Sequence, residues 1–271
     1  MKKTYVGWFG EFSLDPDIDY YGDSYWQRVS SKTYEPDTMV FLENNLNSTT
    51  DFVDVGAATG AMSIIAGKLG SRVLSFEAVP RVCEIAMAHI NGNPEISGRI
   101  ILRNQAISSN PGTLELGKNS DPKVLASISN EEPSDSEKST VEIVSLIDQL
   151  DSFHQKGNKL VIKVDIEGAE WKLLSDKNTL EGLSRHKAKV LLAIHPGFNR
   201  PLKVLPMGLT FLTKKYWQLQ NLVIVYRFFR TLLKMAVVHR TSLDRIHSSK
   251  KCVLLMFGGY FEFILDFGES P

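Results

Sequence analysis

One short stretch constrains the fold more than any other. The apolar, β-branched segment 51–55 leads directly into the glycine-containing turn 56–60, and an apolar run follows at 61–69. This order is typical of a buried parallel strand followed by a helix whose N-terminus faces a ligand. Gly56 can adopt a positive φ angle, and Gly60 permits a close approach between backbones that a Cβ would block. The free N–H groups of the helix start suit an anionic group such as a carboxylate or phosphate.

A second landmark narrows the choice of ligand. Residues 72–77 form a second predicted strand that ends in Glu77, about 20 residues after the turn, where folds of this kind place a ribose-binding carboxylate. Position 58 is Ala, so the second glycine of a dinucleotide fingerprint is missing and a pyrophosphate fits less well. We therefore expect S-adenosylmethionine rather than a dinucleotide. A strand-to-helix turn without any ligand is the remaining alternative.

The composition excludes several classes of protein. The chain has 271 residues, 43% of them hydrophobic, and no net charge, so it can bury a full core and has no overall attraction to nucleic acid. Cys83 and Cys252 are too few and too far apart for a disulfide framework or a metal site. The N-terminus lacks the apolar segment of a signal peptide, and no apolar run approaches the ~20 residues of a membrane-spanning helix. We expect a cytoplasmic α/β protein.

Charge is nevertheless distributed unevenly along the chain. No Asp or Glu occurs between Gly182 and Leu243, although this range is rich in Lys and Arg, and such segregation indicates an anionic partner or a solvated basic face. Within residues 221–238, basic side chains recur at helical spacing opposite a broad apolar face, at Arg227, Arg230 and Lys234. Such a helix can lie in a membrane interface. We therefore expect either peripheral membrane contact or packing of this helix on the sheet or another subunit.

The rest of the chain alternates strands with helices. Residues 1–50 are aromatic and irregular, become helical near Asp37, and are predicted to cover the front of the sheet. Their Tyr and Trp side chains either pack there, which we favour, or line a substrate pocket. Residues 51–271 form the main domain, with 198–249 a basic helical insertion. Further strands are predicted at 99–106, 159–165 and 190–195, and helices at 80–90, 146–153 and from Trp171. A β-hairpin pairs 113–116 with 140–144 across a predicted loop.

Near the C-terminus, two apolar segments flank Gly258-Gly259, a two-residue hairpin signal, and are predicted to pair as strands 252–257 and 260–267. The whole pattern predicts an α/β fold with a doubly wound, mostly parallel sheet and this antiparallel hairpin at its edge.

Several blocks resemble the FkbM-type family of S-adenosylmethionine-dependent methyltransferases, which have a Rossmann-like class I fold. The most family-specific block is Ile162-Lys-Val-Asp-Ile-Glu-Gly-Ala-Glu170. The others are Tyr34-Glu-Pro36, Val53-Asp-Val-Gly-Ala57, Phe76-Glu77 with Pro80, Asn104-Gln-Ala-Ile-Ser108 with Gly112, Ser145-Leu-Ile-Asp148 and Ile194-His-Pro196, so that the resemblance covers about residues 34–197. There are two departures: Ala58-Thr59 replaces the usual Asn and aliphatic residue, and Ala193 replaces the usual Glu before Ile-His-Pro.

The resemblance implies where the cofactor S-adenosylmethionine binds. Asp54 and Gly56 would hold the methionine moiety in a turn that also contains Ala57 and Thr59, and Gly60 would make the close approach. Glu77 would bind the ribose hydroxyls, and the corner Asn104-Gln105-Ala106 would border the adenine. Each group follows the carboxyl end of a predicted strand, where open α/β sheets bind ligands.

Candidate catalytic residues follow the next two strands. Asp165 and His195 would face the same crevice, and a hydroxyl acceptor gains from a base such as His195, since the unperturbed pKa of histidine is ~6.5. Asp165 can instead hold the cofactor's amino group or orient the acceptor, and His195 can instead be bonded to backbone. Glu167 and Glu170 complete a carboxylate cluster with Asp165; a divalent metal is an alternative, but the helix dipole alone favours acids there. We expect no metal.

These observations predict an S-adenosylmethionine-dependent O-methyltransferase that acts on a hydroxyl, with a sugar of a glycan or glycolipid, including an anionic one, as the favoured acceptor. The acceptor class rests on the resemblance alone. One alternative is a nucleic-acid methyltransferase that binds the nucleic-acid backbone through the acid-free region, although no nucleic-acid motif is present. The other is a non-catalytic binding module that has kept the fold.

Overall fold

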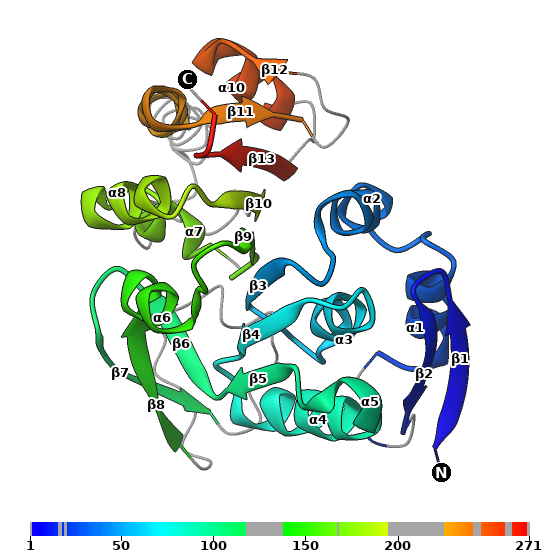
Figure 1. Ribbon diagram of the computed structural model, residues 1–271. Coiled ribbons are helices and arrows are strands. Elements are labelled where there is room, and N and C mark those ends of the chain that lie inside the picture. The colour runs from blue at the N-terminus through cyan, green and yellow to red at the C-terminus, as the bar shows by residue number, and fades with distance from the viewer. Residues whose placement is uncertain are drawn as a thin grey trace, which may run out of the picture.

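The structure is a computed structural model that describes residues 2–15, 18, 21–117, 138–166, 168–194, 225–240, 245–257 and 262–269. It contains a central sheet with helices on both faces (Figure 1). Several sequence predictions lie outside the described residues. They are the loop between residues 117 and 138, Glu167, His195, and the parts of the basic insertion at 198–224 and 241–244.

In the described part of the chain, the central sheet has eight strands in the order β12-β11-β13-β10-β9-β3-β4-β5. From β3 to β5 and from β3 to β10 all neighbouring strands are parallel, whereas β13 runs antiparallel to both β10 and β11. The strands are β3 (Thr50–Val55), β4 (Arg72–Phe76), β5 (Ile100–Arg103), β9 (Lys159–Val164), β10 (Lys189–Ala193), β11 (Val237–His239), β12 (Arg245–Ile246) and β13 (Glu262–Asp266).

The chain order reverses beside β3. From β3 the chain proceeds outward through β4 to β5, and β9 then returns to the other side of β3 and continues to β10. In open α/β sheets, ligands bind outside the carboxyl ends of the strands at such a switch point. The arrangement confirms the predicted doubly wound, class I methyltransferase-like fold, and it places the candidate site at the ends of β3, β4 and β9.

The two faces of the sheet build two apolar cores, as side-chain alternation along the strands requires. On β3, Phe52 packs into one core, and Val53 and Val55 pack into the other. The first core contains side chains of α1 (Asp23–Ser30), α2 (Pro36–Asn45), α3 (Ala61–Lys68), α4 (Pro80–Asn91) and α5 (Pro94–Ser97). The second contains side chains of α6 (Leu146–Phe153), α7 (Glu170–Leu173), α8 (Lys177–Arg185), helix 225–235 and α10 (Ser249–Phe257).

The N-terminal segment is more regular than its aromatic sequence suggests. It begins with an antiparallel hairpin of β1 (Lys3–Gly7) and β2 (Gly10–Leu14), which the prediction of an irregular segment missed. The aromatic residues stack on one another, with Phe12 5.4 Å from Tyr5 and 5.8 Å from Trp26 between ring centroids. Trp26 is 1% exposed. The segment therefore contributes part of the core that covers one face of the sheet.

A second, smaller sheet follows β5. The predicted strand 99–106 is divided at Asn104, so that β6 (Gln105–Ser108) leaves the central sheet and pairs in parallel with β8 (Lys138–Ser145). The strand β7 (Gly112–Gly117) pairs antiparallel with β8, which confirms the predicted hairpin. This division turns Gln105 toward the carboxyl edge of the central sheet.

The predicted C-terminal hairpin is wrong. Residues 252–257 belong to the helix α10, in which Cys252 and Met256, four residues apart, are both buried. Four-residue spacing of buried side chains is a helical period, and this short apolar run does not distinguish a helix from a strand by sequence alone. The other predicted strand does form, as β13, but it lies inside the sheet between β10 and β11 rather than at its edge.

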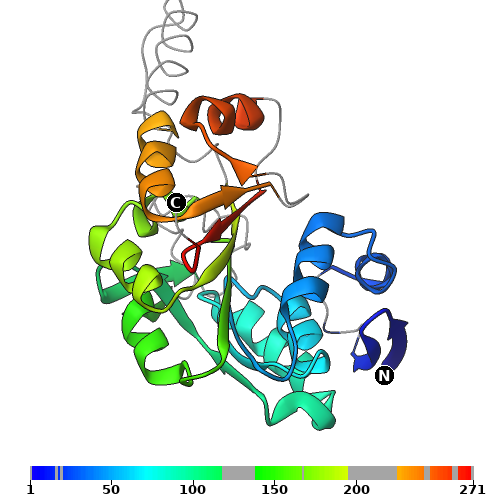
Figure 2. The same cartoon turned by 45° about the horizontal axis from the view of Figure 1, so that its top comes forward.

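The apolar face of helix 225–235 is also internal. Phe228, Phe229 and Leu232 are buried, and the Phe229 ring lies 4.7 Å from that of Phe263 on β13. Arg227, Arg230 and Lys234 remain exposed. The helix thus packs on the sheet, as one of the two sequence interpretations expected, and α10 lies beside β12 at the same end of the sheet (Figures 1 and 2). No helix within the described ranges has the length and apolarity to cross a membrane.

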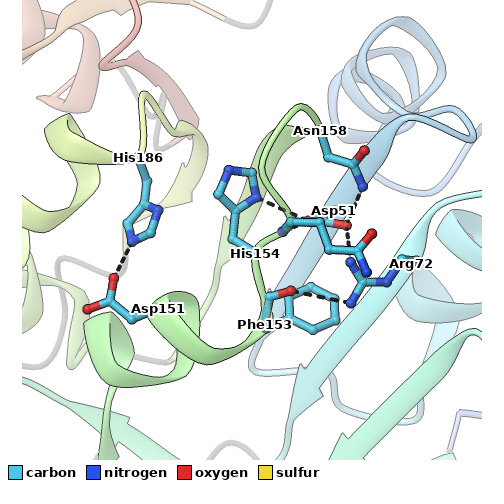
Figure 3. A network of polar contacts seen from close by, with 8 residues as sticks. Asp51, Arg72, Asp151, Phe153, His154, Asn158 and His186 are labelled. Atoms are coloured by element: carbon cyan, nitrogen blue, oxygen red, sulfur yellow. Dashed lines mark hydrogen bonds and ion pairs between the residues drawn. The ribbon is translucent and has the colours of Figure 1, made fainter.

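A buried carboxylate ties together the amino ends of the strands (Figure 3). Asp51, at the start of β3, is fully buried and accepts hydrogen bonds from Arg72 Nη1 (3.0 Å), Asn158 Nδ2 (2.8 Å) and the Gln155 backbone N–H (2.7 Å). His154 Nδ1 lies 3.0 Å from its second oxygen. The same Arg72 also donates to the Phe153 carbonyl oxygen, 3.3 Å away. The network joins β3, β4 and the connection between α6 and β9, at the edge opposite the candidate site.

We expect Asp51→Asn to lower the free energy of unfolding by about 2–4 kcal/mol, because an amide cannot satisfy the Arg72 guanidinium and all the other donors at once. Urea denaturation measures this change. Glu43→Gln, which removes one partner of the exposed Lys32–Glu43 ion pair, is the control and should change stability by less than ~0.5 kcal/mol. Equal stability of both variants would show that the network does not stabilise the fold.

Candidate functional site

A cavity of about 220 Å³ opens at the carboxyl ends of β3, β4 and β9. Its wall combines the glycine turn, the end of β4, the start of β6 and three tyrosines of the N-terminal segment. The lining residues are Tyr21, Tyr25, Tyr34, Glu35, Val55, Gly56, Ala57, Ala58, Ala61, Met62, Phe76, Glu77, Ala78, Gln105, Ala106, Ile107, Lys163, Asp165, Ile166 and Ala169. The cavity therefore occupies the switch-point crevice that the sheet topology indicates.

The glycine turn is fixed against two neighbouring strands. Gly56 has a φ of +90°, and a Cβ there would lie 1.9 Å from the carbonyl oxygen of Asp165. The backbone N–H groups of Gly56 and Ala57 both donate to the Phe76 carbonyl oxygen, at 3.0 and 2.9 Å. The Asp165 N–H donates to the Val55 carbonyl oxygen at 3.0 Å. No side chain fits at position 56, so the requirement for glycine comes from packing between β3 and β9 as well as from the turn.

Glu77 holds the turn from the end of β4. Its carboxylate accepts hydrogen bonds from the backbone N–H groups of Ala58 (2.9 Å) and Val79 (2.8 Å), one on each oxygen. Burial raises the pKa of Glu77 to about 7, although these two hydrogen bonds act in the opposite direction. A carboxylate has about four acceptor positions, so Glu77 keeps capacity to accept a hydrogen bond from a ligand hydroxyl.

The corner after β5 supplies an unpaired acceptor. The Asn104 side-chain amide donates to the carbonyl oxygens of Glu77 (2.8 Å) and Ala78 (3.0 Å), which fixes the corner to the end of β4. Gln105 donates through Nε2 to Glu142, 2.6 Å away, while its Oε1 is buried and has no hydrogen-bond partner within the described structure. A buried carbonyl oxygen without a donor is costly, so this atom fits a ligand N–H group in the cavity.

A buried ammonium group lies under the site. Lys163, on β9, is 4% exposed and is paired in register with Asp54 of β3; its Nζ lies 2.6 Å from Asp165 Oδ2. Burial disfavours the ammonium form, but the carboxylates of Asp165, Glu35 and Asp54 outweigh it and hold the pKa of Lys163 above its usual range. Burial also raises the pKa of Asp54 to about 6, against the effects of Lys163 and of the Ser63 hydroxyl, which donates at 2.7 Å.

Two further carboxylates surround this ammonium group. Glu35, at the start of α2, lines the cavity with a strained φ of +41°. Glu262 begins β13, is paired in register with Ala193 of β10, and is half-buried. Burial raises the pKa of Glu262 to about 7, assisted by the negative charges of Glu35, Asp37 and Asp165 and opposed by Lys163. Several acids thus share one cation, and this side of the site is predominantly negative.

The loop after β9 closes on itself. Glu170 is fully buried, and its two carboxylate oxygens accept from the backbone N–H groups of Ile166 (2.9 Å) and Gly168 (2.8 Å). Glu170 does not line the cavity. These bonds direct the carboxylate into the loop that carries Asp165, and a catalytic role for Glu170 stays a prediction. No cluster of potential metal ligands occurs among the described residues.

The predicted cofactor residues divide into two groups. Gly56, Ala57, Glu77, Gln105, Ala106 and Asp165 line the cavity. Asp54, Thr59, Gly60 and Asn104 do not, and instead support the residues that do: Gly60 starts α3 with its would-be Cβ 3.4 Å from Ala86, and the Thr59 carbonyl oxygen lies 3.0 Å from His89 Nδ1. Glu167 and His195 lie outside the described residues.

Part of the other side of the cavity was not predicted. Lys163 and the pair Tyr34-Glu35 stand in blocks that carry the family resemblance, but no role at the site was expected for them. Tyr21 and Tyr25 line the cavity from α1 and the residues before it, as one of the two interpretations of the N-terminal aromatic residues expected, while Trp26 packs in the core. The available signal was a lysine in an otherwise apolar buried strand, which requires a carboxylate partner.

One protein family matches the part of the chain that contains most of the cavity lining. The methyltransferase FkbM domain matches residues 54–207, which is more than half of the chain and includes the last two residues of β3 together with β4, β9 and β10. No curated protein matches the sequence significantly.

Solved structures with a related architecture are distant. An O-methyltransferase from Bacillus cereus, solved with S-adenosylhomocysteine, is 13% identical, covers 92% of this chain and 92% of its own, and has a TM-score of 0.44. A geranyl diphosphate C-methyltransferase from Streptomyces coelicolor is 11% identical, covers 93% of this chain and 84% of its own, and has a TM-score of 0.40. At these values the similarities do not inform the acceptor.

We expect Gly56→Ala to lower the free energy of unfolding by at least ~2 kcal/mol, because the new Cβ meets the Asp165 carbonyl and the positive φ is strained for alanine. Gly98→Ala is the matched control, since a Cβ there has open space and an ordinary φ, and it should change stability by less than ~0.5 kcal/mol. Chemical denaturation compares the two. A Gly56→Ala protein as stable as the Gly98→Ala protein would contradict the described packing between β3 and β9.

Proposed function

The chain belongs to the FkbM-domain family of methyltransferases, and on this premise we propose that it is an S-adenosylmethionine-dependent O-methyltransferase whose acceptor is a sugar hydroxyl of a glycan or glycolipid. One observation carries the cofactor assignment: Glu77 and Gln105, two residues that line the same cavity, each carry a hydrogen-bond acceptor with spare capacity. When bound, S-adenosylmethionine supplies a methyl group that its sulfonium charge makes electrophilic.

The residues present fit the chemical groups of this cofactor. Glu77 would accept hydrogen bonds from the ribose hydroxyls, and Gln105 Oε1 would accept one from the adenine amino group. Ala61 and Met62 place the first turn of α3 at the cavity wall, where its N–H groups suit the methionine carboxylate. The apolar side chains of Ile107, Val55 and Phe76 give the cavity surface for a ring.

The charge of the site favours a cationic cofactor and a neutral acceptor. Glu35 and Asp165 line the cavity, Asp54 and Glu262 lie near them, and Lys163 is the cation among these acids. Negative potential attracts a sulfonium ion and repels phosphates. This supports an uncharged hydroxyl as acceptor over an anionic glycan, and it disfavours the nucleic-acid alternative at this cavity.

Proton removal from the acceptor has three candidate residues. Asp165 lies on the cavity wall, but the ammonium of Lys163 stabilises its ionised form, which suits it to orient a hydroxyl or a cofactor amino group. Glu262 has a pKa of about 7, the range in which a general base works best at neutral pH. We retain His195 as the base proposed from the sequence, in the segment that follows β10.

Calorimetric titration tests the cofactor. We expect S-adenosylmethionine to bind with a Kd on the order of micromolar and NAD not to bind. Gln105→Leu should weaken binding roughly tenfold, equivalent to one hydrogen bond of about 1.4 kcal/mol, and Glu77→Gln should weaken it by at least as much. Glu43 does not line the cavity, so Glu43→Gln is the control and should bind like the parent. Unchanged affinity in both cavity variants, or preferential binding of NAD, would contradict the proposal.

The affinity for S-adenosylmethionine should rise with pH between about 5.5 and 7.5. The pKa of Glu77 is about 7, so in the free protein this carboxyl is protonated at the lower end of that range and ionised at the upper end. Only the ionised form accepts hydrogen bonds on both oxygens and attracts a cation, so binding releases a proton and weakens as pH falls. Titration in buffers of different ionisation enthalpy measures the proton release. In Glu77→Gln, the pH dependence of the affinity and the proton release should both decrease. An equal pH dependence in parent and variant would exclude Glu77 as the titrating group.

A further inference from the structure

A second concave surface lies at the other end of the sheet. A groove of about 420 Å³ is formed by helix 225–235, by residues 247–248 and by the first turn of α10. Its lining residues are Tyr226, Arg230, Leu233, Lys234, His247, Ser248, Ser249 and Lys250. It shares no residue with the methyl-transfer cavity, from whose strands it is separated by β13 and β10 in the order of the sheet.

The helical period places the groove residues of helix 225–235 on one side of that helix. Tyr226, Arg230, Leu233 and Lys234 recur at spacings of four, three and one, which places them on one side, while Phe228, Phe229 and Leu232 are buried on the other. The apolar face is therefore occupied by the core, and the basic face remains available to a partner. This excludes insertion of the apolar face of the described helix into a membrane.

Three basic side chains line the groove. Arg230, Lys234 and Lys250 are exposed, come from two different helices, and form no ion pair within the described residues; among these residues no Asp or Glu lines the groove. Three cations that converge without a counter-ion repel one another, and an anion that binds between them relieves that repulsion. Two basic residues of the acid-free range between Gly182 and Leu243, Arg230 and Lys234, thus meet Lys250 in one depression of the surface.

We propose that this groove binds a phosphate ester. The Arg230 guanidinium can bond two phosphate oxygens at once, Lys234 and Lys250 add point charges, and the hydroxyls of Ser248 and Ser249 add donors. The start of α10 adds the partial positive charge of a helix N-terminus. Tyr226 and Leu233 supply apolar surface for the group that bears the phosphate. A soluble phosphate ester and a phospholipid headgroup share this chemistry.

The test uses two double variants of the full chain. Arg230→Glu with Lys250→Glu changes one groove residue on each helix. Arg227→Glu with Lys251→Glu is the matched control, because both residues are exposed, lie on the same two helices, fall outside the groove and change the net charge equally. Inorganic pyrophosphate is the soluble probe, followed by calorimetry. Vesicles of phosphatidylcholine with and without phosphatidic acid are the lipid probe, followed by co-sedimentation.

We expect at least one probe to bind the parent and the control variant alike, and the groove variant to lose at least roughly tenfold in affinity. Pyrophosphate binding alone identifies a soluble ligand, and binding only to vesicles with phosphatidic acid identifies a lipid headgroup; either result supports the site. Binding of neither probe, or equal losses in the two double variants, overturns it, since equal losses reflect net charge alone. S-Adenosylmethionine binding should be unchanged in both variants, which separates this result from the fate of the proposed methyltransferase function.

Discussion

The carboxyl edge of the sheet depends on the buried ammonium group of Lys163. An unpaired charge at such depth would be strongly unfavourable, so the surrounding carboxylates are required for folding as well as suited to function. The pairing of β3 with β9 places Asp54 opposite Lys163, and the turn of the chain after β9 brings Asp165 into an ion pair with Lys163. Glu35 approaches from the N-terminal segment. The cation thereby couples three separate parts of the chain at the point where the strand order reverses, and the cavity opens there.

Much of this fold could be predicted from sequence because its strongest elements are local. The apolar strand followed by Gly56 and Gly60 indicated β3 and α3, and the strand ending in Glu77 indicated β4. The incorrect predictions of secondary structure have a common cause. At these positions, contacts between residues far apart in the sequence determine the structure. The apolar run 252–257 is compatible with a helix or a strand. Burial of both Cys252 and Met256, which are four residues apart, fits only the helix. The β1–β2 hairpin likewise depends on packing of Phe12 against Trp26.

The candidate site could also be predicted only in part, because local patterns indicate strand ends but not contacts between distant segments. Residues that follow strand ends, such as Glu77, Gln105 and Asp165, were identified from their position in the pattern. Asp54 and Glu170 were predicted to contact ligands, but neither lines the cavity, because the sequence does not reveal which way a carboxylate turns. Tyr21 and Tyr25 reach the cavity only through tertiary packing of the N-terminal segment. The neutral composition of the chain also concealed two concave surfaces of opposite sign, the acidic cavity and the basic groove.

The central claim is that the cavity at the switch point binds S-adenosylmethionine through Glu77 and Gln105. A crystal structure of the chain with S-adenosylhomocysteine tests this most directly. We predict a ribose within hydrogen-bond distance of the Glu77 carboxylate and an adenine amino group on Gln105 Oε1, with the thioether sulfur toward Asp165. A ligand bound elsewhere on the chain, or in this cavity without contact to Glu77 and Gln105, would contradict it.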